Sequence, residues 1–170
     1  MRLSFLPRWI TGSVTDISPA FLQSKGITLL MLDFDNTLVP YTTNTPTEGV
    51  LAWLGKMQEQ GIRLCVVSNS RKDRVKIFCK TYHIPCITHA KKPFSKGIAA
   101  CLEAFSAKAG ESALVGDQIF TDTLGANFAG VSPILVKAIH NHNIWLKLRH
   151  IAELPFIFIA RKRRMENEKH

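Results

Sequence analysis

Long apolar runs are missing from this chain of 170 residues. The longest apolar stretch near its end, residues 155–160, is far shorter than the roughly 20 residues that cross a bilayer. The N-terminal residues also lack a continuous apolar region followed by a small-residue cleavage site. We therefore expect neither a membrane span nor a signal peptide.

Cysteine is scarce and shows no paired spacing. The four cysteines form no C-x-x-C pair, and each lies in an apolar segment: Cys65, Cys79, Cys86 and Cys101. This pattern favours buried, reduced thiols over disulfides. Reduced thiols are typical of the cytoplasm, so we expect a cytoplasmic protein.

Acidic residues are also few, at 13 against 22 lysines and arginines, which gives a formal net charge of +9. The excess indicates an anionic partner, which the charge alone leaves open: a phosphorylated substrate, a nucleic acid or a lipid surface. Apolar residues make up 46% of the chain, which excludes a disordered tail, a collagen-like repeat and a coiled coil. The length suits one domain.

Short apolar runs alternate with helical patterns along the chain. Strands are expected at residues 27–32, 62–67, 84–88, 112–115 and 131–136. Helices are expected from a capping box at Thr45–Glu48 to a stop at Gly61, after caps at Ser70 and Asp73, from Ser95 to near Gly110, and over 121–129. This alternation predicts a three-layer α/β fold around a parallel sheet of about five strands.

Polar side chains follow each of the first four predicted strands: Asp33 and Asp35, then Ser68, then Lys92, then Asp117 and Asp122. Ligands of parallel α/β folds bind beyond the carboxyl ends of strands, so a site is expected here. Carboxylates that converge on one pocket repel one another unless a cation neutralises them. Oxygen ligands favour Mg²⁺ over zinc.

Asp33-Phe-Asp-Asn-Thr-Leu38 resembles the D-x-D-x-T motif of the haloacid dehalogenase (HAD) phosphatase superfamily. The strand ending in Ser68, the Lys92-Pro93 pair and the segment Gly116–Asp122 are similar to this family in order and context. The four motifs span residues 27–130. The resemblance implies a Rossmann-like HAD core and an enzyme that hydrolyses phosphomonoesters.

The resemblance also implies roles for these residues. Asp33 attacks phosphorus to form an aspartyl-phosphate, and Asp35 acts as acid and then as base. Lys92 balances charge, with neighbouring Lys91 as the rival candidate.

The remaining implied roles concern phosphate and metal. Ser68 binds the phosphate, with Asn69 beside it either touching substrate or supporting the loop. Asp117 binds Mg²⁺ with the carboxylate of Asp33 and the carbonyl of Asp35, and Asp122 acts through a water.

A cap domain is not expected, because residues 39–44 and one helix and strand after Ser68 leave no room for one. Asp16-Ile-Ser-Pro19, Leu22 and Gly26-Ile27, leading into the first motif, are similar to the bacterial YqeG-type (subfamily IIIA) HAD phosphatases. These resemble the mitochondrial phosphatidylglycerophosphate phosphatases, although Phe34 stands where that group often has Lys. An open site suits a large substrate, such as a lipid phosphate, or closure by a second copy in a homo-oligomer.

The C-terminal segment combines apolar, aromatic and basic residues. We expect residues 1–143 to form the core with an N-terminal extension, and residues 144–170 to form a helical tail that packs on or extends the core. Residues 145–164 suit peripheral contact with the inner face of an anionic membrane, or packing on the sheet with a solvated basic end. His140, His142 and His150 are interpreted as surface histidines rather than metal ligands.

Three functions remain open from the sequence. The leading one is a Mg²⁺-dependent phosphatase, with phosphatidylglycerophosphate as its candidate substrate. The second is a soluble phosphatase for sugar phosphates or nucleotides. The third is a non-catalytic module that binds RNA or a protein, and the set of acidic and basic motif residues argues against it.

Overall fold

The computed structural model describes residues 4–139, 155 and 159. The predicted domain boundary at residue 143, the three histidines from His140 onward and, apart from Pro155 and Ile159, the proposed membrane-contacting segment lie outside the described residues. Within the described part of the chain, no helix has both the length and the apolar character that crossing a membrane requires.

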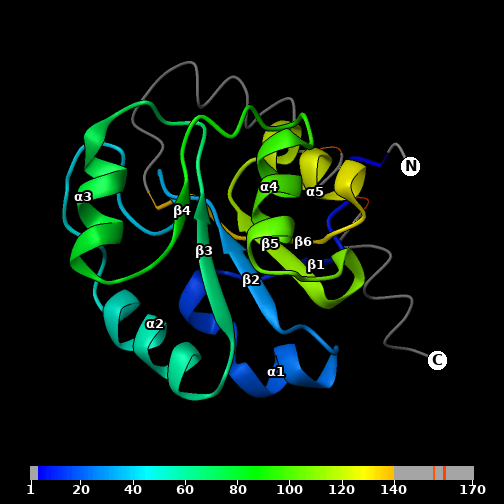
Figure 1. The fold of residues 1–170 in the computed structure, drawn as a ribbon, viewed down its shortest axis with the longest axis horizontal. Helices are drawn as coiled ribbons and strands as arrows, with labels where there is room; N and C mark the ends of the chain where they lie inside the picture. Colours follow the sequence, from blue (N-terminus) through cyan, green and yellow to red (C-terminus); the bar gives the residue numbers. More distant parts are fainter. Residues whose placement is uncertain (1–3, 140–154, 156–158, 160–170) are drawn as a thin grey trace.

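In the described part of the chain, six parallel strands form one sheet in the order β1-β6-β5-β2-β3-β4 (Figure 1). The strands are β1 (Trp9–Ile10), β2 (Leu29–Leu32), β3 (Arg63–Val67), β4 (Cys86–Ile87), β5 (Ser112–Gly116) and β6 (Ser132–Leu135). The predicted parallel α/β fold is confirmed, with one strand more than the five expected. The additional strand is β1, which pairs with β6, and its two residues are too short to show a periodic pattern.

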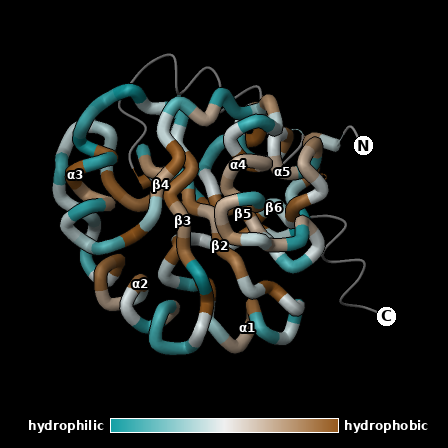
Figure 2. The backbone as a smooth tube through the Cα atoms, in the orientation of Figure 1, coloured by the Kyte–Doolittle hydropathy of each residue, from teal (hydrophilic) through white to brown (hydrophobic). Residues whose placement is uncertain are grey.

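Helices cover both faces of the sheet and make three layers. They are α1 (Pro19–Ser24), α2 (Val50–Glu59), α3 (Asp73–Thr81), α4 (Lys96–Ala104) and α5 (Leu124–Ala129). Leu30 and Leu32 of β2 pack toward α1, α2 and α3, whereas Leu29 and Met31 pack toward α4 and α5. Because both faces are covered, the strands are largely apolar, as Figure 2 shows along the centre of the molecule.

Helix ends account for most differences from the sequence predictions. The capping box at Thr45–Glu48 is wrong, because α2 begins at Val50 after Gly49, whose positive φ of 80° turns the chain into the helix. Gly61 does end α2, with a φ of 78°. The helix expected to reach Gly110 ends at Ala104, because Ser106 adopts a left-handed conformation with φ 47°.

Two further expectations concern the start of α3 and the cysteines. Lys72 is the N-cap residue of α3 and makes no side-chain capping bond, so Ser70 and Asp73 do not cap the helix as predicted. The backbone N–H of Lys72 instead donates to Ser70 Oγ at 3.2 Å. All four cysteines are free, and three are buried as predicted, whereas Cys86 is only partly buried.

The connections of the sheet diverge between β2 and β5. From β2 the chain moves outward through α2 to β3, whereas from β5 it moves in the opposite direction through α5 to β6. Loops that follow neighbouring strands and diverge in this way leave room for a ligand at the carboxyl ends. Only α2 lies between β2 and β3, and only α3 between β3 and β4, so the described chain has no cap domain.

Gly97 in α4 determines how closely this helix approaches the segment before Lys92. A Cβ at Gly97 would lie 2.6 Å from the Cα and carbonyl oxygen of Ala90, whereas one at Gly55 in α2 would meet nothing within 4 Å. We expect Gly97→Ala to lower the free energy of unfolding by about 1–3 kcal/mol, because the backbone must move. The matched Gly55→Ala should raise it by about 0.5–1 kcal/mol. Urea denaturation measures both, and equal effects would contradict this account of the packing.

Candidate active site

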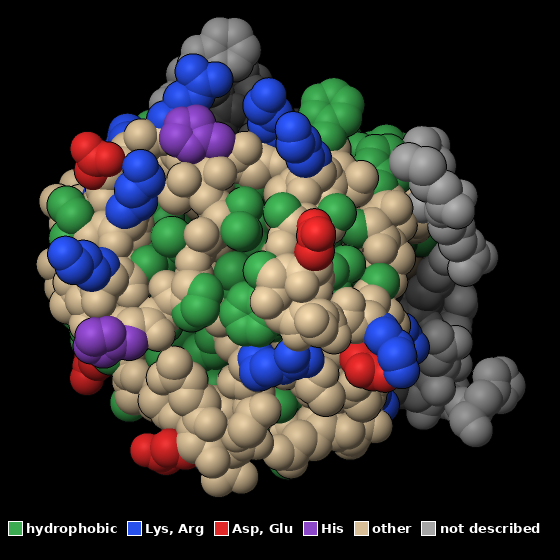
Figure 3. All heavy atoms as spheres, viewed as in Figure 1, with side chains coloured by type: hydrophobic (Ala, Val, Ile, Leu, Met, Phe, Trp, Pro, Cys, Tyr) green, Lys and Arg blue, Asp and Glu red, His purple; other side chains and the backbone are tan. Residues whose placement is uncertain are grey.

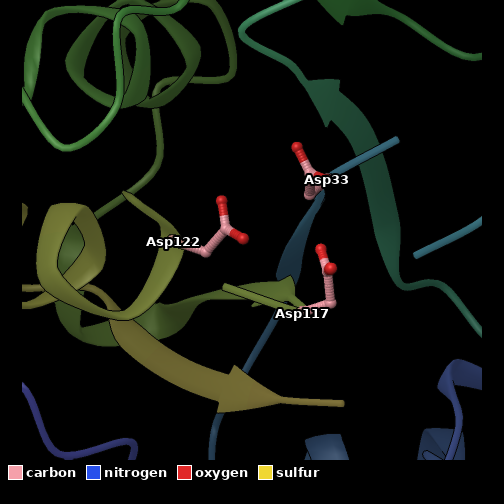
Figure 4. Close-up of side chains that lie close together, drawn as sticks. All are labelled: Asp33, Asp117 and Asp122. Carbon is pink, nitrogen blue, oxygen red and sulfur yellow. The ribbon is translucent and has the colours of Figure 1, made fainter. Parts of the chain in front are cut away.

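Three aspartates converge beyond the carboxyl ends of β2 and β5. Asp33 follows β2, Asp117 follows β5, and Asp122 lies in the short π-helix η3 (Ile119–Thr123). One carboxylate oxygen from each lies within 4.8 Å of the others, and the three side chains approach a common space (Figure 4). The backbone N–H of Asp33 donates to Val115 O at 2.8 Å, so the pairing of β2 with β5 continues into the site.

Gly116 allows Asp122 to fold back over the end of β5. A Cβ at Gly116 would overlap the Asp122 carboxylate, so only glycine leaves space for this side chain. The backbone N–H of Gln118 donates to Asp122 Oδ2 at 3.1 Å, and the N–H of Asp122 donates to Gln118 O at 2.9 Å. This closed turn fixes the third carboxylate.

Lys92 brings a positive charge into the acidic cluster. Its Nζ lies 2.6 Å from Asp33 Oδ1 and 2.7 Å from Asp122 Oδ1, and its side chain is only 1% exposed. The rival candidate Lys91 is exposed. The structure therefore brings Lys92, and not Lys91, into contact with the aspartates.

The side chain of Asn69 holds the backbone of Lys92. The Lys92 N–H donates to Asn69 Oδ1 at 2.7 Å, and Asn69 Nδ2 donates to Lys92 O at 2.9 Å. Ser68 is buried beside it at the end of β3, and its Oγ accepts a hydrogen bond from the backbone N–H of Ser70 at 3.0 Å. Both the oxygen and the nitrogen of the Asn69 side-chain amide thus form hydrogen bonds within the chain.

The cluster carries more negative than positive charge. Three carboxylates against one ammonium leave a formal charge of −2. Burial raises the pKa of Asp33 to about 7, although Lys92 opposes this and Asp122 adds to it. Desolvation also raises the pKa of Asp117 well above its usual range, and the charges of Asp33 and Asp122 contribute. A divalent cation at this point would offset the repulsion.

The same charges act on Lys92 in the opposite sense. Burial disfavours its ammonium form, but Asp122 and Asp33 outweigh burial and raise the pKa of Lys92. The lysine is therefore charged across the physiological range and neutralises part of the cluster.

Asp35 lies outside this triad, in the loop that follows Asp33. Its carboxylate Oδ1 lies 3.5 Å from Nη1 of Arg74 in α3. Burial raises the pKa of Asp35, whereas Arg74 and Lys72 oppose the shift. Thr37 in the same loop donates from Oγ1 to Asp117 Oδ1 at 3.2 Å, which ties the loop to the acidic cluster.

Arg74 is the residue at this site that the sequence did not single out. It lies in a run with Arg71, Lys72 and Lys76, which are exposed. A run of basic residues usually forms the solvent-exposed face of a helix, so the sequence gives no reason to single out one of them. The spacing of Arg74 places it on the same side of α3 as Phe78 of the core. This helical spacing is the sequence feature that could have separated Arg74 from its exposed neighbours.

Comparison with known proteins identifies the family. Residues 39–136 match the family model described as haloacid dehalogenase-like hydrolase. The chain is also 34% identical over 136 residues to the probable phosphatase YqeG of Bacillus subtilis, covering 80% of this chain and 79% of the relative.

Solved structures share the fold at low sequence identity. A HAD-superfamily hydrolase from Ehrlichia chaffeensis matches with a TM-score of 0.55 and 17% identity, over 74% of this chain and 95% of that one. The cobalt-bound deoxy-D-mannose-octulosonate 8-phosphate phosphatase of Haemophilus influenzae matches with a TM-score of 0.51 and 16% identity, over 74% and 75%. On the family model and the Bacillus relative together, this chain belongs to the haloacid dehalogenase-like hydrolases.

Proposed function

We propose that this protein is a Mg²⁺-dependent phosphomonoesterase that works through an aspartyl-phosphate on Asp33. The observation that carries the proposal is the largely buried cluster of Asp33, Asp117 and Asp122 with the Lys92 ammonium 2.6 Å from Asp33. The Bacillus relative, a probable phosphatase, supports the same class of reaction.

The donor set suits a hard divalent cation. All three candidate ligands are carboxylates, and their oxygens lie within 4.8 Å of one another. We assign metal binding to the carboxylates of Asp33 and Asp117, with the carbonyl of Asp35 completing the set and Asp122 acting through a water. When bound, Mg²⁺ neutralises the charge that the phosphate and the nucleophile share.

Asp33 is assigned as the nucleophile, and Asp35 as the general acid and then the general base. A carboxylate oxygen of Asp33 forms a bond to phosphorus while the bond from phosphorus to the leaving oxygen breaks, and Asp35 gives that oxygen its proton. In the second step a water oxygen bonds to phosphorus as its proton passes to Asp35. The bond between phosphorus and Asp33 then breaks and releases phosphate.

The other site residues hold the reacting groups in place and offset their charge. Lys92, ion-paired with Asp33, is assigned to hold the nucleophile in place and to offset the charge of the phosphoryl group. The hydroxyl of Ser68 is assigned to donate to a phosphoryl oxygen. For Asn69 the sequence leaves two roles open: contact with the substrate phosphate or support of the loop. Its two hydrogen bonds to the Lys92 backbone favour the alternative role of supporting the loop.

The surroundings of the site suit an anionic substrate. Figure 3 shows several Lys and Arg side chains gathered at the upper rim of the molecule, the end toward which the strands of Figure 1 point. In the segments that follow β3 and β4, the exposed basic residues include Arg71, Lys72, Lys91 and Lys96. Positive potential around a cleft raises the encounter rate of phosphorylated molecules.

Among phosphomonoesters, we favour a lipid phosphate of the phosphatidylglycerophosphate type. The absence of a cap domain in the described chain leaves the site open to a large headgroup. Tyr41, six residues after Asp35, and Phe94, two residues after Lys92, are 48% and 71% exposed, and we assign them to apolar contact with the lipid. The basic and apolar segment at 145–164 is assigned to peripheral membrane contact. A soluble sugar phosphate is the second candidate, because a structural neighbour is named for one.

Replacement of the nucleophile tests the reaction. Asp33→Asn should lower kcat by at least about a thousandfold, because an amide cannot form the acyl phosphate. Asp73→Asn, at an exposed aspartate in the first turn of α3, should leave kcat unchanged and serves as the matched control. Steady-state assays with phenyl phosphate measure both variants. Wild-type activity in Asp33→Asn would refute the mechanism.

The dependence on Mg²⁺ can be measured both in enzyme activity and in thermal stability. Chelation with EDTA should abolish turnover, and added Mg²⁺ should restore it. Saturating Mg²⁺ at about 100 times Kd should stabilise the wild type by about 2.7 kcal/mol in thermal unfolding. Asp117→Asn should weaken this response, because one ligand is lost, while Asp73→Asn retains it. The same Mg²⁺-induced stabilisation in Asp117→Asn would contradict the assigned ligand.

A substrate panel separates the lipid from the soluble candidates. We expect kcat/KM for phosphatidylglycerophosphate in anionic vesicles to exceed that for sugar phosphates and nucleotides by at least about tenfold, roughly the effect of 1.4 kcal/mol. Truncation of residues 161–170 should reduce only the activity on vesicles, because the basic residues attract an anionic surface. Turnover of soluble phosphates with no hydrolysis of the lipid would overturn the lipid assignment.

A further inference from the structure

Arg74 in the first turn of α3 joins two elements of the site. Its Nη1 donates to Tyr41 O at 2.7 Å, and its Nη2 donates to Pro40 O at 2.8 Å. The guanidinium carbon lies 5.1 Å from the centre of the Phe34 ring, within range of a cation–π contact. With its side chain 11% exposed, Arg74 is largely withdrawn from solvent.

The same guanidinium faces the carboxylate of Asp35. Nη1 lies 3.5 Å from Asp35 Oδ1, and this buried oxygen has no hydrogen-bond partner within the described chain. Residues 35–41, here called the acid loop, therefore meet Arg74 at their first residue and at their last two. Inside the loop, the Asn36 N–H donates to Val39 O at 2.8 Å, and the Tyr41 N–H donates to Asn36 Oδ1 at 3.0 Å.

These contacts leave the acid loop closed on itself and attached to α3 through one side chain. The internal bonds fix its shape, and the two bonds from Arg74 fix its position relative to the helix. A carboxyl group at the start of such a loop has few ways to move without breaking the bonds at its end. The location of the Asp35 carboxyl therefore depends on Arg74.

We propose that Arg74 is a positioning residue that holds Asp35 where its proton reaches the leaving oxygen of the substrate. The inference rests on the proposed function, because it assumes that Asp35 is the acid. In that step the bond from phosphorus to the leaving oxygen breaks, and the proton of the Asp35 carboxyl moves to that oxygen.

Two observations favour positioning over contact with substrate. Both terminal nitrogens of Arg74 already donate to backbone carbonyls, so the guanidinium is turned toward the protein. Lys72, the other nearby cation, is exposed, and its Nζ lies 4.2 Å from the centre of the Tyr41 ring. Lys72 supplies charge, whereas the planar fork of Arg74 also supplies fixed geometry.

The test compares substrates that differ in their need for an acid. Phenyl phosphate has a basic leaving oxygen that requires a proton, whereas 2,4-dinitrophenyl phosphate releases a stable anion. We expect Arg74→Lys, which keeps the charge and loses the fork, to lower kcat/KM for phenyl phosphate by about tenfold to a hundredfold. The loss for 2,4-dinitrophenyl phosphate should stay below about threefold. The quantity kcat/KM reports the first half-reaction, in which the leaving group departs.

Three further variants complete the design. Asp35→Asn should show the same selective loss, and to a larger extent. Arg74→Gln should resemble Arg74→Lys, and Lys76→Met, at an exposed residue of the same helix, should match the wild type on both substrates. Because both substrates are measured on one preparation, the ratio of their kcat/KM values does not depend on the fraction of folded enzyme.

The outcomes separate this inference from the proposed function. Equal losses on the two substrates, or no loss on either, in both Arg74 variants would overturn the positioning role. If Asp33→Asn is inactive while the Arg74 variants keep the wild-type ratio, only the positioning role fails. If Asp33→Asn is as active as the wild type, the aspartyl-phosphate mechanism fails, and the role of Arg74 fails with it.

Discussion

The Lys92 ammonium between Asp33 and Asp122 is the interaction on which the rest of the site depends. Three carboxylates gathered at a largely buried position repel one another, and each loses hydration when it leaves water. Lys92 offsets one charge through contacts of 2.6 and 2.7 Å. A divalent cation would offset the remaining negative charge, so the repulsion that destabilises the cluster by itself would favour a bound ion.

The sheet supplies the geometry that this electrostatic balance requires. Asp33 and Asp117 come from adjacent strands whose connections diverge, so neither is covered by the helix that follows its strand. Lys92 comes from the loop after β4, at the far edge, and must reach inward across β3. Asn69, at the end of β3, bridges that distance by holding the lysine backbone. Each strand from β2 to β5 thus contributes to one site.

Much of this arrangement follows from the sequence because the signals are local and strong. Apolar runs that end in Asp33 or Asp117 identify buried strands with polar residues at their carboxyl ends, and strand direction then brings these residues together. Helix starts were less predictable, because Gly49 and Lys72 begin their helices without a side-chain cap. The contact between Arg74 and the loop after Asp33 depends on tertiary packing between distant segments, which a single sequence pattern does not encode.

The strand β1, which the sequence pattern did not predict, affects how readily the sheet can pair with a strand of another molecule. Among the residues that the structure describes, β1 and β4 form its two edges, and each is only two residues long. An edge strand offers unpaired backbone groups on which a foreign strand can align, and a longer edge offers more of them. Because the described sheet ends in its two shortest strands, it presents little backbone for self-association, even though its inner strands are largely apolar on both faces.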